Sequence, residues 1–300
     1  MLRFEREQRV YNIGGVEIGG QPGERPAVLI GSIFYARHRI VTDAQAGVFD
    51  EEQATALLDD EARVAAFTGN PRFVDPVGST TEALIRYIDF LASHTSAPIL
   101  VDSPLQRVRI EAIRHFAGSD IATRLIYNSI AEDRTAEELG AIKDCGIRSA
   151  IVLAFSTRAV KPEHKLRLLE DELLPAAAQA GVENVLVDTG VLDVPSVSWS
   201  ALAIRLVKER LGYPAGCAPA NAIWTWEKMK AQGTEAHISA TAALLATVLG
   251  QGADFLLYGP IRTAPWVYPA VATANALMAY GGRFVGTRPQ TEGHPLYKVF

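Results

Sequence analysis

Cysteine is scarce in this 300-residue chain, which contains only Cys145 and Cys217. Two cysteines so far apart in sequence exclude a disulfide framework and a cysteine-rich zinc site, and they favour a reducing compartment. No apolar run approaches the roughly 18 residues of a membrane span, and the longest candidate, 238–249, suits a buried helix. The charged first ten residues also lack the apolar core of a signal peptide. We therefore expect a cytoplasmic protein without a membrane span.

Positive charge is not in excess either. The chain has 29 lysine and arginine residues against 34 aspartate and glutamate residues, and its net charge of -5 offers no basic surface for nucleic acid. The sequence has no HExxH or CxxC motif, and no lysine follows a strand-like run where it could form a Schiff base. The six histidines are scattered, so no Ser/His/Asp triad can be assembled. These absences exclude several common enzyme classes.

What the chain does contain is a regular alternation of strand-like and helix-like segments. The strand-like segments are short apolar runs typical of buried parallel strands. They are residues 27–31, 72–74, 98–101, 123–127, 149–155, 184–187, 215–218 and 254–258. Between them, stretches such as 80–94, 162–180 and 196–211 repeat apolar residues at helical spacing.

Eight such units in roughly 270 residues predict an α/β fold of the (β/α)8 TIM-barrel type. The main alternative is an open doubly wound sheet. A nucleotide-binding sheet of that kind carries a glycine-rich GxGxxG turn after its first strand, and none is present here.

The N-terminal segment and the helix starts carry local signals of their own. Residues 10–20 read as a β-hairpin around a Gly-Gly turn. Thr135 and Glu138 have the spacing of a capping box at the start of a helix. We expect residues 1–300 to form a single barrel domain, with residues 1–25 as a hairpin segment that caps its lower end.

Polar residues follow several of the apolar runs at the point where each strand should end. They are Asp75, Asp102, Asn128, Asp188 and Asn221. In a barrel of this type the active site is built at the C-terminal ends of the strands. Each residue alone could instead cap a helix or form a turn, and Asp75, which precedes a proline, fits that reading best. Together they could bind a divalent cation, or a flat heterocycle that presents both donors and acceptors.

Long stretches of the sequence make a family resemblance specific. They are YNIGGVEIGGQPGERPAVLIGSIFY at 11–35, TGNP at 68–71, LIRYIDF at 84–90, IYNSI at 126–130, AIVLAF at 150–155 and ADFLLYGPI at 253–261. Over essentially its whole length the chain resembles the MtrH family, the subunit of tetrahydromethanopterin S-methyltransferase that handles the pterin. It looks still more like the bacterial relatives that pass methyl groups between methylated corrinoid proteins and tetrahydrofolate.

The resemblance implies roles for the five strand-end residues. The barrel is also similar to folate-dependent corrinoid methyltransferases and dihydropteroate synthases, in which Asp, Asn and Asp at successive strand ends hold the pterin. That similarity implies a pterin site formed by Asp102, Asn128 and Asp188, with Asp75 beside them. It places Asn221 near N5 of the pterin, and it makes Asn221 and Asp188 the expected catalytic residues. No bound metal is expected.

The same resemblance implies the reaction and its partners. The expected function is methyl transfer between N5 of tetrahydrofolate, or a related tetrahydropterin, and a corrinoid such as methylcobalamin. The chain has no DxHxxG corrinoid-binding motif, so the cobalamin cofactor should arrive on a separate corrinoid protein. A homodimer is expected, with the apolar helices 238–249 and 264–280 as its candidate face. Loop 36–49, which contains two arginines and a histidine, is expected at the barrel mouth.

Three other functions stay open at this point. A condensation like that of dihydropteroate synthase would need a cationic phosphate site near the last strands, where only Arg262 is available. A non-catalytic pterin-binding scaffold would have no need of the Asp, Asn, Asp set. A metal-dependent aldolase or isomerase would respond to chelators.

Overall fold

The computed structural model of the chain describes residues 2–299, apart from the side chain of residue 230. Eight parallel strands close into a barrel, and each strand coincides with one of the apolar runs found in the sequence. The barrel strands are β3 (Val28–Ile33), β6 (Arg72–Pro76), β7 (Ile99–Asp102), β8 (Leu125–Ile130), β9 (Ser149–Leu153), β10 (Asn184–Asp188), β11 (Ala215–Cys217) and β12 (Phe255–Pro260). They pair in chain order, and β12 closes the barrel against β3. The (β/α)8 prediction is confirmed.

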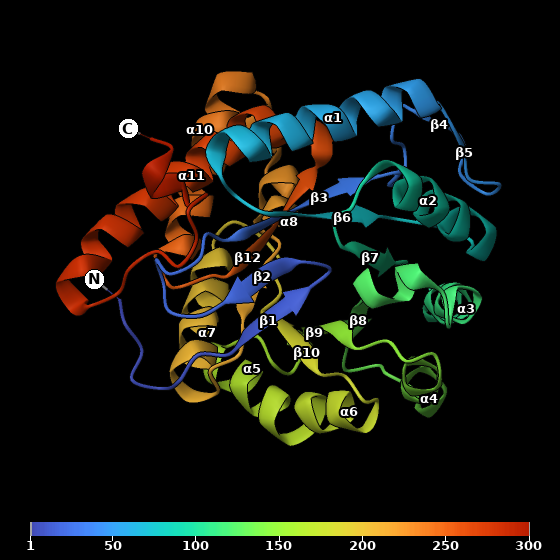
Figure 1. Cartoon of the computed structure of the whole chain (residues 1–300), viewed down its shortest axis with the longest axis horizontal. Helices are drawn as coiled ribbons and strands as arrows, with labels where there is room; N and C mark the ends of the chain where they lie inside the picture. Colours follow the sequence, from blue (N-terminus) through green and yellow to red (C-terminus); the bar gives the residue numbers. More distant parts are fainter. Residues whose placement is uncertain (1, 300) are drawn as a thin grey trace.

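Helices connect the strands and surround the barrel (Figure 1). They are α1 (Glu51–Thr68), α2 (Thr81–His94), α3 (Gln106–Phe116), α4 (Ala136–Asp144), α5 (Pro162–Leu168), α6 (Leu174–Gln179), α7 (Val197–Arg210), α8 (Pro219–Thr225), α9 (Glu227–Lys230), α10 (Thr234–Leu249) and α11 (Ala264–Gly282). A π-helical turn, Leu169–Leu173, joins α5 to α6. Within the described part of the chain, no helix has the length and apolar character needed to cross a membrane.

Helix α2 illustrates why these segments are helical. The hydroxyl of Thr80 caps it by accepting a hydrogen bond from the Ala83 backbone N–H at 3.1 Å. Its residues Leu84, Ile88 and Leu91 recur at helical spacing and are fully buried. That stripe packs the helix onto the barrel wall.

The capping box at α4 forms only in part. Thr135 accepts the hydrogen bond from the Glu138 backbone N–H at 3.2 Å, as expected. The Glu138 carboxylate does not return to the cap. It binds Arg109, Tyr127 and Gln106 instead, because a buried arginine is a stronger partner than a backbone N–H. This half of the prediction was wrong.

Two short hairpins complete the fold. The first, β1 (Val10–Ile13) and β2 (Val16–Gly19), turns through Gly14 and Gly15, whose φ angles of 54° and 86° favour glycine. The side chains of Ile13 and Ile18 are 1% exposed. They pack against the inward-facing residues at the N-terminal ends of the barrel strands. The second hairpin, β4 (Val41–Asp43) and β5 (Val48–Phe49), lies between β3 and α1.

An apolar layer fills the N-terminal half of the barrel. Its members are Val28, Ile30, Phe73, Leu100, Ile126, Ile151, Leu186 and Phe255. Because side chains alternate between the two faces of a strand, the next residue to point inward lies two positions beyond the last member of this layer on each strand. That next layer lies at the C-terminal mouth and carries the polar residues.

Candidate active site

The next inward layer consists of Ser32, Asp75, Asp102, Asn128 and Asp188, with Leu153 and Leu257. The strand register brings the polar members side by side. Ser32 pairs with Asp75, and Asp102 pairs with Asn128. An isolated β-bridge between Val77 and Asp102 places the end of β6 beside the end of β7, and so brings the two pairs together. Since neighbouring strands lie about 4.8 Å apart, three of the predicted site residues are adjacent on one side of the mouth.

These residues line a cavity of about 460 Å³ at the barrel mouth. Asp188 reaches it from the end of β10, and Asn221 reaches it from the first turn of α8. The structure therefore brings all five sequence-predicted site residues into one cavity. The cavity is also lined by Ser32, Val77, Ser103, Arg109, Ser129, Leu153, Phe155, Gly190, Val191, Ala218, Ala220, Leu257 and Gly259.

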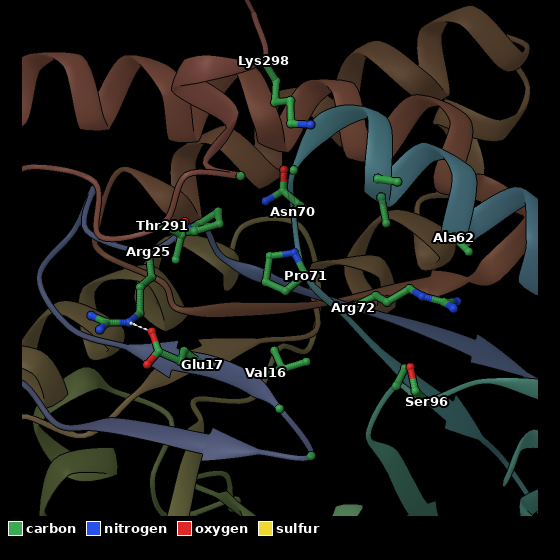
Figure 2. A pocket seen from close by; sticks show the side chains of 18 residues that line it. Val16, Glu17, Arg25, Ala62, Asn70, Pro71, Arg72, Ser96, Thr291 and Lys298 are labelled. Atoms are coloured by element: carbon green, nitrogen blue, oxygen red, sulfur yellow. Dashed lines mark hydrogen bonds and ion pairs between the residues drawn. The ribbon is translucent and has the colours of Figure 1, made fainter.

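A larger cavity of about 720 Å³ lies at the opposite end of the barrel, between the hairpin turn and the start of β6 (Figure 2). Two of its charged lining residues are engaged in ion pairs: Arg25 binds Glu17 at 2.9 Å, and Arg72 binds the buried Glu61 at 3.0 Å. Barrel enzymes place their chemistry at the C-terminal face, and the N-terminal face serves stability. The smaller cavity at the mouth is therefore the candidate active site.

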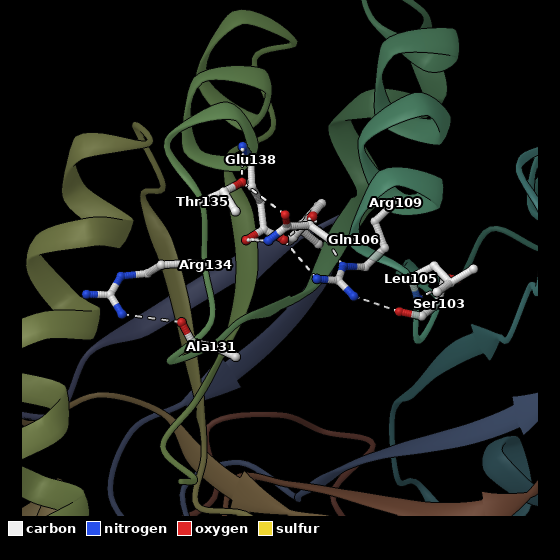
Figure 3. Close-up of polar contacts among 9 residues, drawn as sticks. Ser103, Leu105, Gln106, Arg109, Ala131, Arg134, Thr135 and Glu138 are labelled. Carbon is white, nitrogen blue, oxygen red and sulfur yellow. Dashed lines mark hydrogen bonds and ion pairs between the residues drawn. The ribbon is translucent and has the colours of Figure 1, made fainter.

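A buried polar network supports one wall of the mouth from behind (Figure 3). Arg109 binds Glu138 at 2.8 Å and donates to the hydroxyl of Tyr127 at 3.2 Å. Its other guanidinium nitrogen donates to the backbone carbonyl of Ser103 at 2.6 Å, directly after the end of β7. Gln106 adds a hydrogen bond to Glu138 at 2.8 Å. The network fixes the segment that carries Asp102, because every hydrogen bond in it is buried or partly buried.

Comparison with known proteins identifies the family. The family model described as "Tetrahydromethanopterin S-methyltransferase MtrH subunit" matches residues 6–290. The chain belongs to the MtrH family.

Relatives of this MtrH-family protein match it from end to end. The H subunit of tetrahydromethanopterin S-methyltransferase from Methanopyrus kandleri is 40% identical over 97% of both chains. The H subunit of the same enzyme from Methanothermobacter thermautotrophicus is 35% identical over the full length of both. The H subunit of the putative methyltransferase mtx from Methanosarcina barkeri is 36% identical over 99% of both.

Solved structures with the same architecture include dihydropteroate synthases. The enzyme from Yersinia pestis, with a pterine-sulfa conjugate, has a TM-score of 0.64 at 13% identity and covers 90% of this chain and 98% of its own. That from Xanthomonas albilineans, with 4-aminobenzoic acid, has a TM-score of 0.63 at 18% identity and covers 91% and 99%. At such low identity the likeness shows the fold.

Two neighbouring carboxyl groups at the mouth of this MtrH-family protein, those of Asp75 and Asp102, have raised pKa values. Burial raises the pKa of Asp75 to about 6. The hydrogen bond from Ser32, at 2.7 Å, and the interaction with Asp102 partly oppose this rise. Burial and the nearby charge of Asp75 raise the pKa of Asp102 well above its ordinary value, and Arg109 and Asn128 only partly oppose this. Within residues 2–299, Asp75 Oδ1 has no hydrogen-bond partner. Like charges on two neighbouring buried carboxyl groups repel each other, so the pair favours holding a proton.

Asp188 has a different environment across the cavity. Its Oδ1 accepts a hydrogen bond from the Gly190 backbone N–H at 2.7 Å. Burial nevertheless raises its pKa to about 6, although this hydrogen bond and the charge of Lys165 oppose the rise. Lys165 is 3% exposed, and its ammonium group donates to the backbone carbonyls of Thr189 and Gly190. The ring of Phe155, which also lines the cavity, packs over Gly190 and lies 5.3 Å from that ammonium group.

Several of these residues were missed in the sequence. Lys165 lies in α5, far from any strand end in sequence, and reaches Asp188 only through the fold. Ser32, near the end of β3, serves as the hydrogen-bond donor to Asp75. For Arg109 and Phe155 no sequence signal was available, because both follow the strand ends in ordinary-looking segments.

The basic loop 36–49 begins after the C-terminal end of β3, on the side of the barrel mouth. Arg37 and Arg39 are exposed and do not line the mouth cavity. His38 is buried, accepts a hydrogen bond from the Phe34 backbone N–H at 3.2 Å and stacks on Tyr35. Among the described residues, no group of three or more His, Cys, Asp or Glu side chains is arranged to hold a metal ion. The absence of a bound metal stays a prediction.

Proposed function

We propose that this MtrH-family protein is a cytoplasmic methyltransferase. It moves a methyl group between N5 of a tetrahydropterin, most simply tetrahydrofolate, and a corrinoid carried by another protein. The observation that carries the proposal is the convergence of Asp102, Asn128 and Asp188 on one mouth cavity. Family membership supports methyl transfer, and the names of the relatives support a tetrahydropterin substrate.

The ring of a pterin matches this set of side chains. Its aminopyrimidine edge presents parallel N–H donors, and a carboxylate can accept two of them. Asp188 is the best placed for this, because it is buried but flanked by Lys165, which favours its charged form. Asp102 and Asn128 face the ring from the adjacent wall, and the Phe155 ring offers an apolar surface. Volume is also adequate, since the cavity of about 460 Å³ falls in the range of small-molecule sites.

The reaction needs a proton at N5. When the pterin receives the methyl group, N5 attacks the methyl carbon, the N5–C bond forms and the N5 proton leaves. The electron pair of the broken cobalt–carbon bond stays on cobalt. In the reverse direction N5 must be protonated before it can leave. Asn221 is proposed to orient N5, because its side chain is exposed to the mouth and makes no hydrogen bond to the described residues. Asp75 and Asp102 hold a proton close by.

The corrinoid and the dimer are further parts of the proposal. A partner protein must dock over the mouth, because the methyl group moves by only about a bond length. A homodimer is proposed through α11, where Leu277 is 65% exposed and Tyr280 is 55% exposed on one helix face. Large exposed apolar side chains on one face are typical of protein interfaces.

The first test of the pterin site is a measurement of pterin affinity. We would titrate the protein with tetrahydrofolate and methyl-tetrahydrofolate by calorimetry, and compare it with Asp188→Asn. Losing one charge-assisted hydrogen bond costs about 1.5–3 kcal/mol, so the variant should bind at least ten-fold more weakly. Asp89→Asn, on the exposed face of α2, is the matched control and should bind like the wild type.

The outcomes separate the competing functions. Equal affinity of Asp188→Asn and wild type would remove Asp188 from the site. Binding without any methyl transfer would favour the scaffold function. Turnover that a chelator abolishes would favour a metal-dependent enzyme instead.

A further inference from the structure

A second groove adjoins the mouth cavity. This groove has a volume of about 340 Å³. It shares five lining residues with the mouth cavity: Ser32, Val77, Ala220, Asn221 and Gly259. Its own residues are Tyr35, Trp224, Pro260 and Arg262. The groove therefore adjoins the mouth cavity beside Asn221, and a ligand in the mouth can extend toward it.

The walls of the groove are aromatic. Tyr35 follows β3, and its ring is held by stacking on the buried His38, with ring centroids 4.4 Å apart. Trp224 lies in α8, and its ring packs against His237 at 4.8 Å. Gly259 allows α8 to approach, because a Cβ at this position would lie only 2.9 Å from the Cβ of Ala220. Both aromatic side chains are half-buried, so each is held on one side and open on the other.

A positively charged side chain, Arg262, lies at the end of the groove. The guanidinium carbon of Arg262 lies 5.7 Å from the centre of the Trp224 ring. No carboxylate among the described residues forms an ion pair with Arg262. His38 adds no charge, because burial, and to a lesser degree the charge of Arg262, lowers its pKa to about 4. The groove thus offers an aromatic slot that ends in a free positive charge.

We propose that this groove is the subsite for the aryl tail of the tetrahydropterin. The aryl ring lies between Tyr35 and Trp224, and Arg262 binds an anionic group beyond the ring. The inference rests on the proposed function, since the tail is attached at C6, the atom next to N5. If Asn221 orients N5, the tail must leave the mouth beside Asn221, which is where the groove opens. The aromatic slot accepts the ring by stacking, as aromatic side chains accept other flat rings.

Two ligands that differ only in the tail test the proposal. Tetrahydrofolate has the p-aminobenzoyl-glutamate tail, whereas 6-methyltetrahydropterin keeps the pterin and lacks the tail. We would measure the affinity of both for the wild type, Trp224→Leu, Trp224→Phe and Arg262→Gln. Arg39→Gln, which changes an exposed arginine outside the groove, is the matched control.

The wild type should bind tetrahydrofolate more tightly than the tailless pterin. Trp224→Leu should weaken tetrahydrofolate about ten-fold, Trp224→Phe should restore most of that loss, and neither should change the affinity for the tailless ligand. Arg262→Gln should weaken tetrahydrofolate about two- to five-fold, as expected for an exposed ion pair, and Arg39→Gln should have no effect.

Three results would overturn the subsite. Equal wild-type affinity for the two ligands would mean that the tail makes no contact. Equal weakening of both ligands by Trp224→Leu would mean that Trp224 only supports the fold. Unchanged affinities combined with a raised KM for methylcobalamin would assign the groove to the corrinoid. If the wild type binds neither pterin, the proposed function fails, and the subsite fails with it.

Discussion

Replacing Asp188 with asparagine should make the free protein more stable at neutral pH while it weakens pterin binding. The native carboxyl group has a pKa of about 6, raised from its ordinary 3.8 chiefly by burial. A carboxylate that is buried before its ligand arrives destabilises the empty protein at neutral pH. An asparagine avoids this cost and can keep the hydrogen bond from Gly190.

The size of the effect follows from the pKa. A rise of about two units corresponds to about 3 kcal/mol of lost stability above pH 6, and Asp188 is only 7% exposed, so solvent screens little of it. This net shift already includes the opposing effects of Lys165 and Gly190, so asparagine is expected to gain about 1–3 kcal/mol. Between about pH 4 and pH 6 the native state holds the proton and the unfolded chain releases it. The unfolding free energy of the wild type therefore falls, relative to that of the variant, as the pH rises through this window.

Urea unfolding of both proteins at about pH 4 and about pH 7.5 measures this difference. Groups common to the two proteins cancel in the comparison. The variant should be more stable by about 1–3 kcal/mol at the higher pH, with little or no advantage at the lower pH. A variant that is less stable than the wild type at the higher pH, or a difference that does not change with pH, would refute this explanation.

Other substitutions test the surrounding structure. Glu138→Gln leaves the buried charge of Arg109 without its partner, so the unfolding free energy should fall by about 3 kcal/mol in a urea titration. Gly31→Ala would push a Cβ into a buried tyrosine hydroxyl, and soluble expression should drop sharply. Gly140→Ala, in a helix with open space around the new Cβ, should instead raise the melting temperature slightly. Asn221→Ala should lower kcat for methyl transfer at least ten-fold with a smaller change in pterin affinity, measured by steady-state kinetics beside calorimetry.

The barrel could be predicted from the sequence because its strands are continuous apolar runs, each buried on both faces. The same feature exposed the site, since a polar residue at the end of such a run interrupts an otherwise apolar pattern. Asp102, Asn128 and Asp188 carry this signal, and all three line the mouth cavity. The hairpin was equally visible, because its two glycines adopt positive φ angles.

Contacts made by helices and loops could not be predicted in this way. Glu138 has the spacing of a capping box, yet its carboxylate turns inward to Arg109, a choice that depends on which helices are neighbours. Lys165 and Trp224 belong to helices whose sequences look ordinary. Lys165 comes close enough to act on Asp188, and Trp224 lines the groove, only because the barrel brings separate connections to one face.

The most direct test of the proposed function is methyl transfer itself. Methylcobalamin is mixed with tetrahydrofolate under anaerobic conditions, and its absorbance is followed with wild type, Asp188→Asn and the control Asp89→Asn. The proposed function predicts a loss of methylcobalamin and an equal yield of methyl-tetrahydrofolate that require both the protein and tetrahydrofolate. It also predicts a rate at least ten-fold lower for Asp188→Asn and unchanged for Asp89→Asn. Tight pterin binding with no methyl transfer from methylcobalamin or from a methylated corrinoid protein would contradict it.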